Sequence, residues 1–138
     1  MAAEPGRVED TKAWLTKANL DLEAGNHDMK GIPPLLADAA FHSQQAAEKA
    51  MKAFLAWHDI PSRKTHNLDE VGKACSGIDL SLKTVLDRAV PLTEFAWKYR
   101  YPGEPGEPTR EEVEAALKVA RDVYESVLQR LPAETRPA

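Results

Sequence analysis

Apolar residues recur along most of the chain at intervals of three and four, the spacing that places them on one face of an α-helix. The pattern predicts helices over five stretches, residues 8–25, 34–58, 67–77, 80–101 and 110–131. No stretch shows the alternation of β-branched and polar residues that is typical of a strand. Because the apolar residues form stripes, the helices should pack side by side. The sequence therefore predicts an all-α fold, an up-and-down antiparallel helical bundle of four to five helices.

Proline and glycine mark the expected breaks between these helices. Gly25 is expected to end or bend the first helix, and the pair Pro33-Pro34 opens the second, since proline is tolerated in a first turn. Pro91 falls near the middle of the fourth stretch and predicts a kink or two shorter segments. Residues 102–108 repeat Pro-Gly-Glu and cannot stay helical, so a loop is expected there.

Two patterns predict the starts of helices. Asn67 with Glu70 three residues later is a variant of the capping box, and Thr109 with Glu112 is a regular one. In each pattern the first side chain accepts a hydrogen bond from a backbone N–H of the first turn. From Pro132 onward the chain is expected to be a tail.

The length of 138 residues fits one domain with one hydrophobic core. We expect a single domain over 1–138, with its core at about 8–131 and a tail at each end. With 43% apolar and 29% charged residues, the chain is neither disordered nor membranous in character. No run approaches the roughly 20 apolar residues that span a bilayer, so no membrane contact is expected.

The N-terminal residues, the cysteine content and the net charge indicate the cellular location and the kinds of partner to expect. The first ten residues lack the apolar segment of a secretory signal, so a cytoplasmic location is expected. The one cysteine, Cys75, cannot form an internal disulfide, and we expect it to be a buried, inert thiol. The 18 basic and 22 acidic residues give a net charge of −4, which argues against binding of duplex DNA.

The second predicted helix carries the most informative polar residues. On a helical projection, one arc holds Ala37, Phe41, Gln44, Glu48, Met51 and Leu55, and the opposite shoulder holds Asp38, His42, Gln45, Lys49 and Lys52. Polar residues in an apolar arc must find partners, because burying them unpaired costs about 1–3 kcal/mol each. We interpret Gln44, Gln45 and Glu48 as structural or interface residues, with a functional pocket as the alternative. The other shoulder is expected to be a solvated helix face.

Arg100 is the sharpest candidate for binding chemistry. It lies between Tyr99 and Tyr101 at the expected end of a helix, where a guanidinium can cap the helix, stack on an aromatic ring or bind phosphate in a two-pronged way. The nucleotide- or phosphate-binding candidates are Arg100, His42, Lys49, His66 and Tyr101. For His66, a cap or a contact across the bundle is the alternative.

The four histidines argue against a metal centre. None of them has the spacing of a metal-ligand pair, and His42 and His58 lie 16 residues apart, more than four turns of one helix. We therefore expect neither a metal nor a cofactor.

Three separated segments resemble prokaryotic HEPN domains. Residues 41–55 resemble the signature helix of that family, Thr65-His66-Asn67-Leu68 the segment after it, and Arg100-Tyr101-Pro102 an arginine motif near the end of the penultimate helix. Trp14 fits the start, and the resemblance spans about residues 8–131. It implies a helical bundle that commonly forms a homodimer and is often encoded beside a minimal nucleotidyltransferase, as in toxin–antitoxin-like systems.

Many members of that family are metal-independent ribonucleases, in which a histidine follows the arginine after four to six residues. Here no histidine occurs in residues 101–107, so the expected general acid or base is absent from its place. The resemblance therefore implies a non-catalytic or weakly catalytic bundle that binds itself, a minimal nucleotidyltransferase, and a nucleotide or RNA. The alternatives are a ribonuclease toxin that uses Arg100 with a displaced histidine, His42 or His66, and a purely structural adaptor.

Overall fold

The computed structural model describes residues 5–62, 64–103 and 106–138. Every regular element in these residues is helical, and the predicted all-α bundle is confirmed. The α-helices are α1 (Pro5–Met29), α2 (Leu36–Trp57), α3 (Leu68–Ile78), α4 (Lys83–Ala89) and α5 (Arg110–Gln129), and the 3₁₀ helices are η1 (Leu80–Leu82), η2 (Val90–Ala96) and η3 (Ala133–Thr135). Among the helices described, none is long and apolar enough to cross a membrane.

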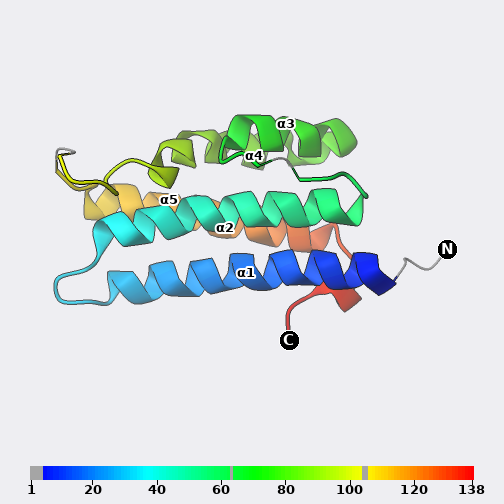
Figure 1. Cartoon of the computed structure of the whole chain (residues 1–138), viewed down its shortest axis with the longest axis horizontal. Helices are drawn as coiled ribbons and strands as arrows, with labels where there is room; N and C mark the ends of the chain where they lie inside the picture. The colour runs from blue at the N-terminus through cyan, green and yellow to red at the C-terminus, as the bar shows by residue number, and fades with distance from the viewer. Residues whose placement is uncertain (1–4, 63, 104–105) are drawn as a thin grey trace.

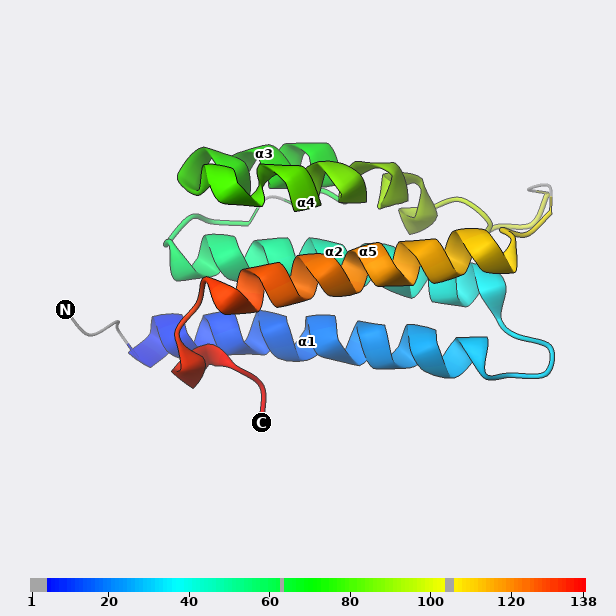
Figure 2. The ribbon, with the colours of Figure 1, turned by 180° about the vertical axis from the view of Figure 1, so that it is seen from behind.

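The long helices lie side by side around one core (Figure 1). α1 and α2 run in opposite directions and share the most extensive interface of the fold. α5 packs against α2 and lies in front of it when the molecule is seen from behind (Figure 2). α3 and α4 form a further layer beside these three helices. Large side chains from α1, α2, α4 and α5 are buried between the helices, among them Leu15, Leu22, Met51, Phe54, Leu86, Val113 and Val123.

α3 runs in the same direction as α2, because the chain between them turns back along α2 (Figure 1). We call the described residues of this connection, 58–62 and 64–67, the return segment. Near its start the N–H of Ile60 donates to the carbonyl oxygen of Leu55 at 2.9 Å, and near its end the carbonyl oxygen of His66 accepts from the Gln44 amide at 3.1 Å. The sequence predicted a polar loop here but not its path, which brings His66 to the middle of α2.

Gly25 was expected to end or bend the first helix. It does not end the helix, because α1 continues to Met29. A Cβ atom at Gly25 would lie 2.6 Å from Cδ2 of Leu117 on α5 and 3.6 Å from the carbonyl oxygen of Ala39 on α2. The glycine thus permits three helices to approach closely. The packing outweighs the helix propensity of glycine, which is only about 1 kcal/mol worse than that of alanine.

The break expected at Pro91 is present, but the helical structure that was expected to extend to Tyr101 ends earlier. α4 ends at Ala89, and the chain continues as η2 from Val90 to Ala96. Proline has no N–H for the next helical bond, which favours the tighter 3₁₀ turns. The N–H groups of Trp97 and Lys98 both donate to the carbonyl oxygen of Glu94, and Tyr99 then adopts a φ of 69°. This left-handed residue turns the chain out of the helix, so Arg100 follows in a loop.

Both predicted caps accept backbone hydrogen bonds at the starts of α3 and α5. The Asn67 side chain accepts from the N–H groups of Asp69 and Glu70, and the Thr109 hydroxyl accepts from the N–H of Glu112 at 3.1 Å. The N–H of Asn67 itself donates to the Thr65 hydroxyl at 3.1 Å. Thr65 therefore takes the position that the capping box assigned to a glutamate.

The chain after Pro132 is not a loose tail, contrary to the expectation. It forms η3, which packs against α1, and Thr135 is fully buried there. The Thr135 hydroxyl donates to the carbonyl oxygen of Pro132 at 2.7 Å, which satisfies the buried group locally. At the other end α1 begins at Pro5, three residues before the predicted start, and residues 1–4 of the expected tail lie outside the described part of the chain.

Candidate functional site

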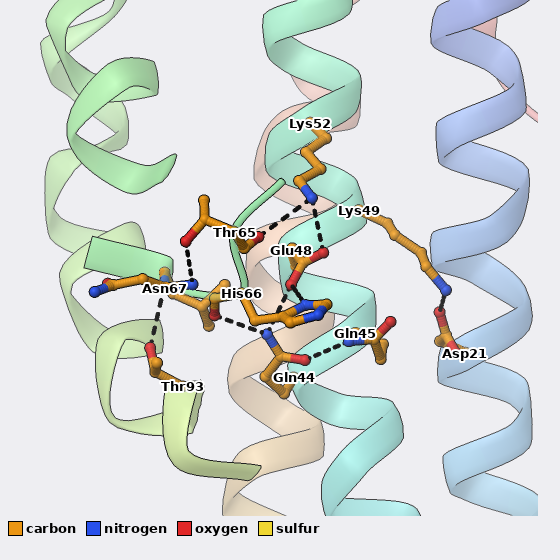
Figure 3. Close-up of polar contacts among 11 residues, drawn as sticks. Asp21, Gln44, Gln45, Glu48, Lys49, Lys52, Thr65, His66, Asn67 and Thr93 are labelled. Carbon is orange, nitrogen blue, oxygen red and sulfur yellow. Dashed lines mark hydrogen bonds and ion pairs between the residues drawn. The ribbon is translucent and has the colours of Figure 1, made fainter. Parts of the chain in front are cut away.

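Polar side chains of α2 point to two sides of the helix (Figure 3). On one side they meet the return segment, and we call this group the Glu48 cluster, formed by Gln44, Gln45, Glu48, Lys52, Thr65 and His66. On the other side they meet α1, and we call this group the Asp21 cluster, formed by Asp21, His42 and Lys49.

Glu48 lies at the centre of the first cluster. One carboxylate oxygen, Oε1, lies 2.7 Å from Nδ1 of His66 and accepts from the Gln44 amide at 3.0 Å. The other, Oε2, accepts from Nζ of Lys52 at 2.9 Å. Lys52 also donates to the carbonyl oxygen of Thr65 at 3.3 Å. These bonds join α2 to the return segment through side chains (Figure 3).

The Glu48 carboxyl is buried but well supplied with donors. Glu48 is 3% exposed and Gln44 is fully buried. Burial by itself raises the pKa of Glu48, but hydrogen bonds from Gln44, Lys52 and His66 together lower that pKa below its ordinary 4.5. The carboxyl is therefore ionised at neutral pH. Gln45 extends the cluster, because its amide donates to Oε1 of Gln44 at 2.6 Å.

Lys52 was expected on a solvated helix face, and this expectation is wrong. The residue is 7% exposed, its ammonium is paired with Glu48, and Nζ lies 5.7 Å from the centre of the Trp14 ring. The return segment covers this part of α2, because the carbonyl oxygen of Thr65 reaches Lys52. His42 and Lys49 of that shoulder are only partly covered, with side-chain exposures of 23% and 22%.

The lowered pKa of Glu48 predicts a loss of stability in acid. Below pH 4.5 this carboxyl takes up a proton in the unfolded chain while it stays ionised in the folded one. The free energy of unfolding should therefore fall as the pH falls from 4.5 through the folded-state pKa. Urea unfolding of the wild type and Glu48→Gln at about pH 6 and about pH 3.5 measures the effect. The difference between the two proteins should shrink at the lower pH, and an unchanged difference would contradict the prediction.

The Asp21 cluster joins α1 to α2. Asp21 Oδ1 lies 2.8 Å from Nδ1 of His42, and Asp21 Oδ2 accepts from Nζ of Lys49 at 2.6 Å. Burial raises the pKa of Asp21, but His42 and Lys49 lower it further than burial raises it. The hydrogen bond to Asp21 raises the pKa of His42 against the opposing effect of burial. The sequence analysis missed Asp21, although a carboxylate among the apolar positions of the first helix was a signal for a buried partner.

Asp28, near the end of α1, is a second acidic residue that the sequence analysis missed. Burial and the neighbouring carboxylate of Asp38 raise its pKa to about 6. No apolar pattern marks Asp28, because the interaction depends on how the hairpin between α1 and α2 closes.

Arg100 stacks on an aromatic ring. Its guanidinium carbon lies 3.6 Å from the centre of the Phe41 ring, and the residue is exposed. Arg100 does not cap a helix, since η2 ends at Ala96, and within the described residues its guanidinium has no hydrogen bond or ion pair. The neighbouring aromatic residues Trp97 and Tyr101 are 56% and 64% exposed. Stacking fixes the guanidinium plane and leaves its N–H edges open.

Tyr101 follows Arg100 directly in the chain, but the other phosphate-binding candidates do not gather around Arg100. The His42 ring meets the Phe41 ring edge-on, at a centroid distance of 5.7 Å. Lys49 is paired with Asp21, and His66 is held by Glu48 although its side chain is 65% exposed. In the part of the chain that is described, no hydrogen bond, ion pair or ring contact joins Arg100 to Lys49 or His66.

Cys75 is a buried thiol, as predicted. Its Sγ donates to the carbonyl oxygen of Met51 at 3.4 Å, and burial raises its pKa to about 12. The thiolate that nucleophilic or redox chemistry needs is therefore not formed at neutral pH.

Comparisons with known proteins place the chain in a family. The family model for the HEPN domain matches residues 11–131, which cover the chain from α1 to the end of α5. Neither the curated proteins nor the solved structures that were searched contain a match.

Proposed function

This chain belongs to the HEPN domain family, and from that premise we propose that it binds a nucleotide or RNA without cleaving it. Membership in the family supports a role connected with nucleotides or RNA. In the proposal, the protein acts as a homodimer and partners a minimal nucleotidyltransferase in a toxin–antitoxin-like system.

The observation that carries the proposal is the exposed Arg100 guanidinium on the Phe41 ring. Because Arg100 pairs with no carboxylate in the described residues, its charge is available to a ligand, and the planar edge of a guanidinium matches the geometry of a phosphate. Trp97 and Tyr101 are exposed close by in the sequence and offer aromatic surface on which a base can stack. A phosphate contact with an aromatic surface beside it fits a nucleotide or a single-stranded RNA.

We propose binding without cleavage because no histidine follows Arg100 at the spacing that a ribonuclease of this family uses. Cleavage of RNA needs a group that takes a proton from the ribose 2′-hydroxyl, and residues 101–107 contain no histidine. A ribonuclease is the second candidate, because the side chain of His66 is 65% exposed and its Nδ1 is held by buried Glu48. Such a pair can orient an imidazole as a base.

The test is a titration with a short single-stranded RNA and with a nucleotide at moderate salt. Arg100→Ala should weaken binding about tenfold, the loss expected for one charge-assisted contact of about 1.5 kcal/mol. Arg100→Lys should keep part of the affinity, because lysine retains the charge but not the planar fork. Arg88→Ala is the matched control, since it removes one exposed arginine paired with Asp122 and should leave binding unchanged.

Three further measurements separate the alternatives. Binding that is indifferent to Arg100 would favour the structural adaptor, and RNA cleavage that is lost in Arg100→Ala or His66→Ala would favour the ribonuclease. Light scattering should give twice the monomer mass of 15.2 kDa, and a monomer that persists at high concentration would remove the homodimer from the proposal. Copurification with the product of a neighbouring nucleotidyltransferase gene tests the partner.

A further inference from the structure

Two carboxylates and an imidazole converge where the hairpin between α1 and α2 closes. Asp28 lies in the last turn of α1, and Asp38 and His42 lie in the first two turns of α2. One ligand atom from each of the three lies within 4.8 Å of the other two. Oδ2 of Asp28 is buried and finds no hydrogen-bond partner among the residues that the structure describes. Carboxylate oxygens that face each other repel unless a proton or a cation lies between them.

The imidazole of His42 is already oriented for this position. Its Nδ1 lies 2.8 Å from Asp21 Oδ1, and Asp21 is neutralised in turn by Lys49 at 2.6 Å. Nε2 therefore points to Asp38, whose Oδ2 lies 3.3 Å away. In metal sites, the ligating histidine typically donates its other N–H to a carboxylate, which fixes the ring and raises the basicity of the ligating nitrogen.

We propose that Asp28, Asp38 and His42 bind a divalent transition-metal ion that fastens the end of α1 to the start of α2. Two ligand atoms at about 2.1 Å from a tetrahedral ion lie about 3.4 Å apart, close to the separation of His42 Nε2 and Asp38 Oδ2. The imidazole favours Zn²⁺ or Co²⁺ over Mg²⁺ and Ca²⁺, which prefer oxygen ligands alone. The site uses none of the contacts of Arg100, so its test is independent of RNA binding.

Calorimetric titration of the full chain with Zn²⁺ at neutral pH, together with the visible spectrum of the Co²⁺ form, tests the site. The wild type should bind one equivalent, and Mg²⁺ should not compete. Asp38→Asn should weaken Zn²⁺ binding about tenfold or more, since one charged ligand is lost. The matched control is Asp87→Asn. The Asp87 side chain is about as exposed as that of Asp38 (58% against 55%), and it also forms an i,i+4 ion pair, in this case with Lys83.

Two further variants define the site. His42→Gln should abolish the Co²⁺ spectrum of a nitrogen ligand, and Asp21→Asn should weaken binding by about tenfold or more by freeing the imidazole. Asp38→Asn decides the question if either of these fails to fold, because Asp38 is more than half exposed. Equal affinities of Asp38→Asn and Asp87→Asn, or no Zn²⁺ binding by the wild type, would overturn the proposal and leave a shared proton as the bridge.

Discussion

An unfolding free energy about 3 kcal/mol or more below that of the wild type is the expected result of replacing Glu48 with alanine. The substitution leaves the ammonium of Lys52 buried at 7% exposure without its carboxylate. It also removes the acceptor of the Gln44 amide and of His66. A buried charge that has lost its partner costs more than the pair contributed, because it can recover neither its hydration nor a substitute.

Urea denaturation monitored by circular dichroism measures this change. Glu94→Ala is the control, since Glu94 forms the same i,i+4 pair with a lysine but is 45% exposed, and it should cost less than about 1 kcal/mol. The double substitution Glu48→Leu with Lys52→Met should recover much of the loss, because it removes both charges. A Glu48→Ala protein that unfolds like the wild type but fails to bind RNA would show that Glu48 serves a binding pocket.

Replacing Phe54 with alanine should lower the free energy of unfolding by about 3–5 kcal/mol. The Phe54 side chain is 1% exposed and is the largest of the fully buried side chains. Its removal loses apolar burial and leaves a cavity that rigid helices cannot close. The ring also contacts His58, at a centroid distance of 4.5 Å.

The same denaturation experiment measures the Phe54 effect. Leu20→Ala provides the comparison, because Leu20 is an apolar residue of α1 that is 50% exposed, and its loss should be about 0.5 kcal/mol or less. A loss in Phe54→Ala no greater than in Leu20→Ala would contradict the burial of Phe54 in the core.

The sequence predicted the elements whose ends depend on local chemistry. The second helix, expected over 34–58, is α2 from Leu36 to Trp57, because alanine-rich turns follow a proline pair. The predicted cap at Thr109 starts α5, whose buried residues lie between Val113 and Val127 at helical spacing. Each of these features follows from residues within a few positions of one another, so the pattern alone was sufficient.

The features that the sequence did not predict depend on distant contacts. Gly25 suggested a break, but Leu117 on α5 makes it a packing position. Lys52 suggested a solvated face, but the return segment covers it. The expected helix over 80–101 stopped at Ala96, because the turn around Tyr99 directs the chain away. Helical periodicity contains no information about which loop folds back over which helix.

The candidate site also has features that residue type predicted and features that depend on the fold. Arg100 and its aromatic neighbours were identified from residue type, but the ring that supports the guanidinium, Phe41, lies in a different helix. The convergence of Asp28, Asp38 and His42 could not be predicted, because it requires the hairpin between α1 and α2 to be closed. Residue chemistry identified candidates, and only the fold determined which of them meet.

We expect the return segment to open locally more easily than the long helices do. Its carbonyl groups at Thr65 and His66 are fastened to α2 by the side chains of Lys52 and Gln44. Amides in a segment that few hydrogen bonds hold to its neighbours exchange with solvent through small fluctuations, whereas those of the packed long helices exchange only when larger units unfold. Detachment of this segment would hydrate Glu48 and Lys52 while α1, α2 and α5 stay together. We therefore expect water to reach this polar part of the interior before it reaches the apolar core.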